Sequence, residues 1–265
     1  MLRNVFLKSL RDQRRALLYW GFGFSALTLL TVAFYPTISE MPEFSELFEN
    51  SEVLVNLFGG GFTDLTSPEG YLNSQLYSLM IPLLFLIFAI THGSGAIAAE
   101  EDRGTLDTLL STPTTRVQVF AQKFAAMIAA ILVLAVVLWL SVILGAIAVG
   151  MEIGLFKVAA ATFSGTLLGV TFGTLAFALG AATGRRGRSV TVTATIAIVS
   201  YFMHSLAPVV EVIEPTRYLS PYYYYIGADP LANGLSLAHV AVLVGLTIAA
   251  AAGSVYVFER RDLAV

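Results

Sequence analysis

The stretch from Ala98 to Lys123, AAEEDRGTLDTLLSTPTTRVQVFAQK, decides how the chain is arranged, because it separates two long apolar segments. It begins with four consecutive charged residues, from Glu100 to Arg103. A charged side chain at the centre of a membrane helix costs about 2.5–3.5 kcal/mol. The chain therefore leaves the membrane at this point.

A short amphipathic helix is predicted inside this stretch, over residues 104–112. Thr105 can cap its start, and three leucines fall at i, i+3 and i+4 on one face: Leu106, Leu109 and Leu110. Pro113 ends the helix, because the residue before a proline is pushed out of the helical region. Thr114 or Thr115 can then cap the next helix, which returns to the membrane. A leucine face that points towards water favours a partner with a groove.

The composition indicates a multi-pass membrane protein. The chain has 265 residues, of which 57% are apolar and only 12% charged, whereas soluble domains are about 25% charged. Cysteine is absent, which excludes disulfides, Cys-ligated zinc and thiol catalysis. The first apolar run is long enough to span the membrane and is followed by no small-residue cleavage site, so we expect a retained helix.

Six spans are predicted, and together they form one all-α transmembrane domain over residues 1–265. The spans cover approximately residues 16–35, 75–99, 124–149, 155–183, 190–208 and 236–258, and two outer loops cover 37–74 and 209–235. A span needs about 20 residues. Residues 1–15 have an apolar face and a basic face, which is typical of a helix lying in the membrane interface. A basic anchor before the first span is an equally good interpretation.

The distribution of basic residues predicts the topology. Thirteen of the fifteen Lys and Arg residues lie on one side of the predicted spans, and only Lys157 and Arg217 lie on the other. The positive-inside rule therefore places both termini in the cytoplasm. The 37–74 loop is outside and acidic, and it contains neither Lys nor Arg. Its apolar residues repeat at helical spacing after Pro42, which indicates a helix on the outer surface.

Three glycines form a ridge on the fourth predicted span. Gly165, Gly169 and Gly173 follow one another at i+4 steps. Small residues at this spacing let a second helix approach closely. We interpret the ridge as a helix-packing surface rather than a ligand site.

The residues argue against several kinds of chemistry. The phosphate-binding loop of ATPases needs a lysine directly after a glycine, and no lysine here follows one. Ion-coupled carriers usually need an ionisable residue at mid-membrane, and the spans hold no clear Asp or Glu there. His92 and His204 lie in or near spans and could be relays or ligands, but without a carboxylate partner we interpret them as packing groups.

An intramembrane serine hydrolase is the alternative from a different class. Gly93, Ser94 and Gly95 lie on one span and His204 on another. Such an enzyme needs a base within hydrogen-bond reach of the nucleophile and an oxyanion hole. Gly93 and Gly95 suit helix packing equally well.

The central stretch resembles the first cytoplasmic loop of ABC-2 type transporter permeases. The resemblance rests on Glu101, Arg103, Gly104, Thr105, Leu106, Leu109, Leu110, Ser111, Pro113, Arg116 and Lys123. Three further features agree with it: the basic N-terminus, the segment from Leu219 to Pro230, and the ending from Phe258 to Leu263. The resemblance therefore covers the whole chain.

This resemblance implies a six-helix half-transporter of a type V ABC exporter, which dimerises and recruits two separately encoded ATP-binding subunits. The 104–112 helix would be the coupling helix that docks in the ATPase, with Glu100, Glu101, Arg103 and Arg116 at its ends. The turn with Arg185, Arg186 and Arg188 matches the place of a second, smaller contact, for which a positive-inside anchor is an equal alternative. The chain itself would bind no cofactor, since ATP and magnesium would be held by the partner.

The expected setting is a prokaryotic plasma membrane, with lipid around the spans and no nucleic-acid partner. Family members export drugs, antibiotics, lipids, polysaccharides and other cargo. The outer loops are apolar and acidic, and the spans lack an obvious aromatic ladder for sugars. A small hydrophobic or amphipathic substrate that enters from the membrane therefore fits better than a polysaccharide.

Overall fold

The computed structural model describes residues 5–40, 66–102, 104, 115–207 and 211–260. Within these residues the chain forms helices and turns, without strands. The helices are α1 (Val5–Ala33), α2 (Tyr35–Ser39), α5 (Pro68–Leu72), the π-helix η1 (Asn73–Tyr77), α6 (Met80–Asp102), α8 (Arg116–Val149), α9 (Leu155–Thr183), α10 (Arg186–Leu206), the 3-10 helix η2 (Glu211–Leu219), α11 (Pro221–Ile226), α12 (Pro230–Asn233) and α13 (Leu237–Arg260).

Six helical segments of the described chain are long and apolar enough to cross a membrane. They are Val5–Ser39, Pro68–Glu101, Arg116–Val149, Leu155–Thr183, Arg186–Leu206 and Leu237–Arg260. The predicted fold class, an all-α polytopic membrane protein with six spans, is confirmed. In α1 the predicted interfacial segment and the first span are continuous, since one helix runs from Val5 to Ala33.

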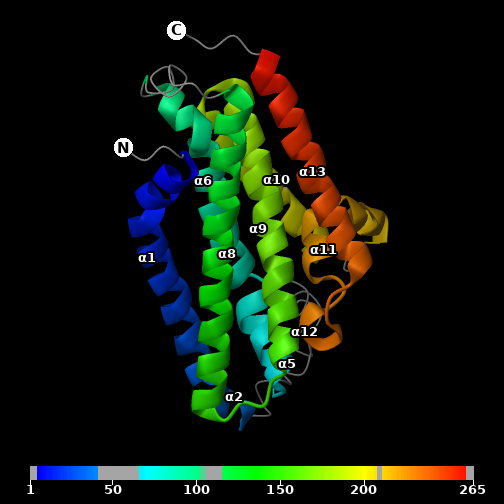
Figure 1. Cartoon of the computed structure of the whole chain (residues 1–265). Coiled ribbons are helices and arrows are strands. Elements are labelled where there is room, and N and C mark those ends of the chain that lie inside the picture. Colours follow the sequence, from blue (N-terminus) through cyan, green and yellow to red (C-terminus); the bar gives the residue numbers. More distant parts are fainter. Residues whose placement is uncertain (1–4, 41–65, 103, 105–114, 208–210, 261–265) are drawn as a thin grey trace.

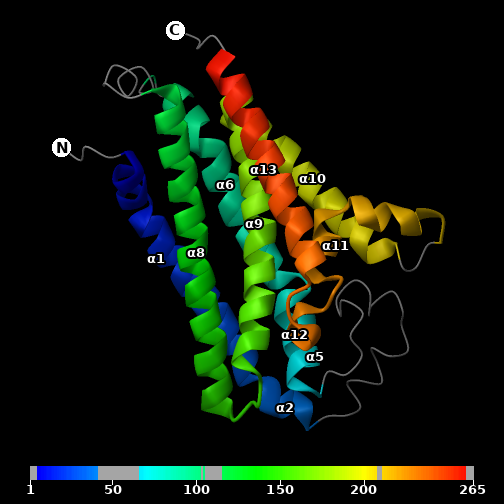
Figure 2. The ribbon, with the colours of Figure 1, turned by 45° about the vertical axis from the view of Figure 1, so that its right-hand side comes forward.

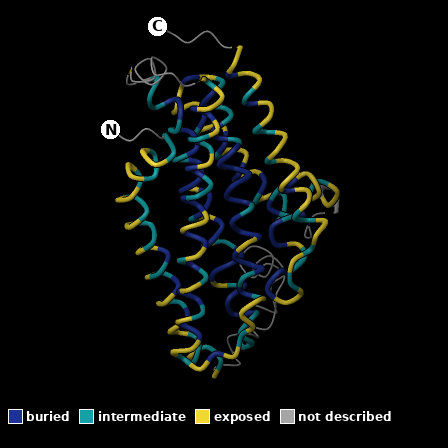
Figure 3. The backbone as a smooth tube through the Cα atoms, viewed as in Figure 1, coloured by how far each residue is buried: buried dark blue, intermediate teal, exposed yellow. Residues whose placement is uncertain are grey.

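The bundle is built around α9. The most extensive contacts join α9 to α6, α1 to α8, and α13 to α9. Figure 1 shows α9 near the middle of the bundle, with α1 and α13 on opposite flanks, and the start of α1 and the end of α13 at the same end of the molecule. The turned view keeps this arrangement and shows η2 and α11 projecting to one side (Figure 2). Buried residues concentrate along α6 and α9 (Figure 3).

Glycines allow the backbones of α6 and α9 to approach closely. A Cβ added at Gly93 would lie only 2.3 Å from the carbonyl oxygen of Gly173. The predicted ridge lies at these contacts: a Cβ at Gly169 would lie 3.1 Å from the Phe85 Cβ, and one at Gly173 3.0 Å from the Ala89 Cβ. At Gly165 the neighbour is the ring of Tyr225 on α11, at 3.3 Å. The ridge therefore faces α6 and α11.

Capping residues determine where several of the helices begin or end. Ser67 accepts a hydrogen bond from the backbone N–H of Gly70 at the start of α5. Thr115 and Gln118 form a reciprocal capping box that starts α8. Gly150 ends α8 with a φ of 69°, a conformation that glycine adopts without steric cost.

Two predicted helices lie outside the described residues. Of the leucine-faced coupling helix, predicted over residues 104–112, all residues except Gly104 fall in the undescribed range 105–114, and the amphipathic outer helix falls in the undescribed range 41–65. Gly104, the first residue of the predicted coupling helix, is described and has a φ of 65°. The predicted outer segment 209–235 contains η2, α11 and α12 between α10 and α13.

Candidate functional site: an apolar groove between two spans

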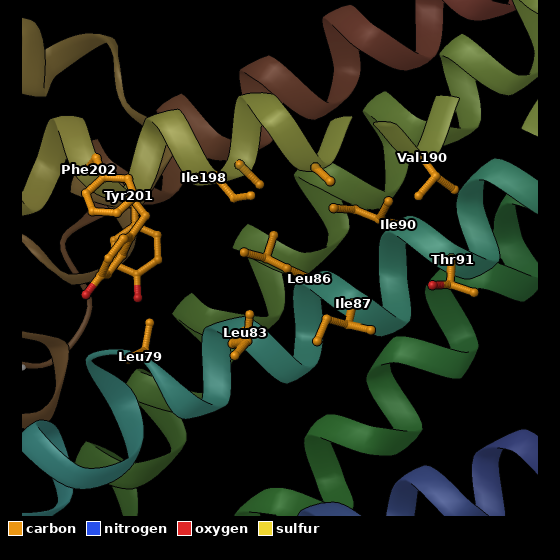
Figure 4. Close-up of a pocket in the computed structure, with 13 residues that line it drawn as sticks. Leu79, Leu83, Leu86, Ile87, Ile90, Thr91, Val190, Ile198, Tyr201 and Phe202 are labelled. Atoms are coloured by element: carbon orange, nitrogen blue, oxygen red, sulfur yellow. The ribbon is translucent and has the colours of Figure 1, made fainter. Parts of the chain in front are cut away.

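An apolar pocket lies between α6 and α10, and its volume is about 390 Å³. On α6 its lining residues recur every three or four positions, so they form one face of that helix. They are Leu79, which directly precedes α6, and Leu83, Leu86, Ile87, Ile90 and Thr91; from α10 come Val190, Ala194, Ala197, Ile198, Tyr201 and Phe202. Figure 4 shows these side chains converging from the two helices.

Tyrosine rings border the pocket at the end formed by Leu79, Tyr201 and Phe202. Tyr222 of α11 lines the pocket, is 2% exposed, and packs edge-on against Tyr201 with ring centroids 5.2 Å apart. Its hydroxyl donates to the carbonyl of Ser78. The hydroxyl of Tyr225 donates to the carbonyl of Tyr77 at 2.6 Å. Both tyrosines therefore attach α11 to the segment that precedes α6.

The segment that receives these hydrogen bonds is irregular for a reason in the sequence. Residues 73–77 form the π-helix η1, in which the Ser78 N–H bonds to the Asn73 carbonyl. Pro82 lies four residues after Ser78 and has no N–H, so it cannot donate to the Ser78 carbonyl. A tyrosine hydroxyl from α11 takes that place. Sequence reasoning missed this contact, although the proline inside the apolar run was a signal for it.

The segment next to α12 carries a half-buried carboxylate. Asp229 accepts hydrogen bonds from the Asn73 side chain and from the Ala232 N–H, both at 3.1 Å. Burial raises the pKa of the Asp229 carboxyl, although the backbone hydrogen bonds from Ala232 and Leu231 oppose this shift. The backbone of Asp229 has a φ of 48°, in the left-handed region, which aspartate tolerates better than most residues. Asp229 thus joins α12 to η1.

At the opposite end of α6, one predicted coupling residue forms a buried ion pair. The Lys123 ammonium on α8 lies 2.7 Å from the Glu100 carboxylate and donates to the Ala96 carbonyl, also at 2.7 Å. Lys123 is 6% exposed and Glu100 21%. The ion pair fixes the last turns of α6 against α8. The chain continues from there into residues 105–114.

The other predicted contact residues are divided between described and undescribed parts of the chain. Glu101 is half-buried on α6, Gly104 is exposed, and Arg116 begins α8. Arg103, Thr105, Leu106, Leu109, Leu110 and Pro113 lie outside the described residues. Arg185, Arg186 and Arg188 are exposed on the α9–α10 turn, at the end of the bundle that holds Glu100.

Ser94 and His204, the candidate nucleophile and base of a serine hydrolase, lie far apart. The Ser94 hydroxyl donates to the Thr91 carbonyl at 3.1 Å. The side chain of Arg186, at the start of α10, lies near Gly95 beside this serine, with its Nε 3.4 Å from where a Cβ at position 95 would be. His204 lies eighteen residues further along α10, about 27 Å away at the helical rise. This separation is incompatible with a Ser94–His204 nucleophile and base.

His92 is held within its own helix. Its Nδ1 lies 2.9 Å from the Phe88 carbonyl, and its ring stacks on the Phe88 ring with centroids 4.0 Å apart. Both contacts fit the predicted packing role. The described spans carry their carboxylates near their ends, at positions such as Asp12, Glu69 and Glu259.

Fold and groove together define a multi-pass membrane protein whose apolar pocket opens between two spans. Comparison with protein families adds the particular identity: residues 3–263 match the family described as ABC-2 family transporter protein. The chain therefore belongs to this family, as the central loop predicted. It is a permease, the transmembrane component of an ABC transporter, and is not itself the catalytic component. Among curated proteins no match was found.

Proposed function

We propose that this permease exports a small hydrophobic or amphipathic molecule and is powered by a separate ATP-binding subunit. The observation that carries the proposal is the pocket between α6 and α10, in a chain of the ABC-2 family. Its lining is almost entirely aliphatic and aromatic. Such a surface suits the apolar part of a ligand, which gains free energy when it leaves water for an apolar site.

The ATP-binding subunit docks on the loop that follows α6, through the coupling helix of residues 104–112. Leu106, Leu109 and Leu110 form the docking face. The ion pair of Lys123 with Glu100 supports this role, because it ties the helix that enters the loop to the start of α8. ATP and magnesium are bound by the partner, and the arginines of the α9–α10 turn form a second, smaller contact.

The functional unit is a homodimer of the permease with two ATP-binding subunits, in a prokaryotic plasma membrane. Several apolar side chains of α10 are exposed on the single chain, including Ile198 at 57% and Phe202 at 48%. Exposed apolar residues on a span require lipid or a second chain as neighbour. A second copy facing α10 would complete a pathway of which one chain provides half.

The test compares two substitutions on the coupling helix. Leu109→Asp removes a leucine whose full burial contributes about 1.5–3 kcal/mol and places a charge in the contact, whereas Asp107→Ala changes the opposite face. We expect both variants to reach the membrane and dimerise normally. Leu109→Asp should fail to retain the ATPase on co-purification, or retain it without stimulated hydrolysis. Equal behaviour of the two variants would reject the leucine face as the docking surface.

A further inference from the structure

The apolar pocket continues into a polar cavity along the same face of α6. Thr91 lines both cavities, and beyond it the lining of the second includes Gly95, Ala99 and Glu100, again at steps of four and one. On α10 the lining continues from Val190 to Arg186, one turn away. The second cavity has a volume of about 250 Å³. We call the two together the α6–α10 groove, with an apolar and a polar section.

The polar section contains donors and acceptors from four helices. The Arg186 side chain crosses the α6 backbone at Gly95, where its Nε would lie 3.4 Å from an added Cβ. Lys123 contributes from α8, and its contacts to Glu100 and Ala96 use two of its three N–H donors. From α1 come Asp12 and Gln13. Glycine at position 95 leaves the space that the arginine occupies.

Several of these groups have unused binding capacity. Within the described chain, neither Arg186 nor Asp12 takes part in an ion pair. The Gln13 Oε1 atom is buried and has no hydrogen-bond partner among the described residues. Because Lys123 and Glu100 neutralise each other, the charges left for a ligand are one guanidinium and one carboxylate. Such a pair complements a headgroup that carries an anion and a cation together.

The dimensions of the groove match a molecule with a chain and a headgroup. From Leu79 to Glu100 the stripe extends over 21 residue-to-residue steps, about 31 Å at the helical rise, which is close to the thickness of the hydrocarbon core. The apolar section, from Leu79 to Thr91, accounts for about 18 Å of this length. The polar section lies at the end of the bundle with the arginine turn, which the charge distribution predicts to be cytoplasmic.

We propose that the α6–α10 groove binds an amphiphile with a zwitterionic headgroup. The alkyl chain lies in the apolar section. The anionic group binds Arg186 and the remaining donor of Lys123, and the ammonium group binds Asp12 and the free carbonyl oxygen of Gln13. This inference rests on the proposed function and names the substrate class for the same pathway.

The test measures binding to the purified full-length permease without its ATPase, in a maltoside detergent. The probe is lysophosphatidylethanolamine, and native mass spectrometry or microscale thermophoresis reports its affinity. A monoacylglycerol of the same chain length lacks the charged headgroup and tests the contribution of that headgroup. Free phosphoethanolamine lacks the acyl chain and tests the contribution of the chain. We expect the zwitterionic amphiphile to bind at least tenfold more tightly than either, since a charge-assisted hydrogen bond changes affinity by about that factor or more.

Substitutions in each section of the groove test whether that section binds the probe. Arg186→Gln and Asp12→Asn should each weaken lysophosphatidylethanolamine binding about tenfold or more, whereas the matched surface changes Arg15→Gln and Glu259→Gln should leave it unchanged. Leu86→Trp, which fills the apolar section, should also weaken binding, in contrast to Leu144→Trp on the exposed face of α8. Size-exclusion profiles and thermal unfolding confirm that each variant is folded.

The result distinguishes this inference from the proposed function. Equal affinity for the neutral monoacylglycerol, or equal weakening by Arg15→Gln and Arg186→Gln, would overturn the zwitterion site. Neither outcome involves the ATPase. The proposed function depends instead on whether Leu109→Asp separates from Asp107→Ala in ATPase retention, so each can fail while the other stands.

Discussion

The hydroxyl of Tyr222 donates a hydrogen bond to the carbonyl of Ser78, a residue 144 positions earlier in the chain. This contact joins the tyrosine-rich helix α11 to the point where Pro82 removes a helical donor. Tyr222 also lines the apolar section of the groove. One residue thus supports both the shape of the second span and the wall of the pocket.

Replacing Tyr222 by Phe keeps the ring in the pocket wall and removes the hydroxyl. We expect the variant to lose about 1 kcal/mol of stability, because the buried Ser78 carbonyl loses this donor. The matched control is Tyr224→Phe, whose hydroxyl bonds to the Tyr218 carbonyl at an exposed site. Thermal unfolding of the detergent-solubilised protein measures both. A Tyr222→Phe variant as stable as the control would show that the hydrogen bond does not contribute.

Lys123 and Glu100 should depend on each other. Lys123→Met leaves a largely buried carboxylate without its ammonium partner, and removing one member of such a pair costs about 3 kcal/mol or more. The double variant Lys123→Met with Glu100→Gln removes both charges and should recover most of that loss. Unfolding midpoints of the wild type, both single variants and the double variant form the necessary cycle. Additive losses would indicate that the two residues do not interact.

Gly93 should not tolerate even a methyl group. Its added Cβ would lie 2.3 Å from the Gly173 carbonyl oxygen, so Gly93→Ala must push α6 away from α9. Overpacking of this kind costs about 1–3 kcal/mol. Gly245→Ala on α13 is the control, because nothing lies within 4 Å of its added Cβ, and alanine favours a helix by about 1 kcal/mol there. Gly93→Ala should lower both the yield of folded protein and the unfolding midpoint, whereas Gly245→Ala should raise both.

The topology can be tested without removing any natural cysteine, since the chain has none. Gly187 and Ala232 are both exposed. If the charge distribution sets the orientation, Ala232→Cys should react with an impermeant maleimide in intact cells, and Gly187→Cys should react only after the cells are opened. Labelling of Gly187→Cys in intact cells would show that the α9–α10 turn faces outside, which contradicts the predicted topology.

The sequence by itself determined the class of protein and the number of spans. Its apolar runs are long enough to cross the membrane, and membrane crossing requires helices whose backbone bonds are satisfied internally. It also determined local helix ends, such as the caps at Ser67 and Thr115, because capping depends on residues only three positions apart. The family could be named from the central loop because its motif is a contiguous run of residues.

Only the tertiary structure decided which residues form the groove. Arg186 was predicted as part of a basic turn and Glu100 as part of the coupling loop, yet both line one polar cavity with Asp12 and Gln13 of the first helix. Their proximity results from the packing of α1, α6, α8 and α10, which local sequence patterns do not encode. The hydrogen bond from Tyr222 to Ser78 likewise joins a hydroxyl and a carbonyl that are 144 residues apart in the chain. Only the packing of the helices brings these two groups together.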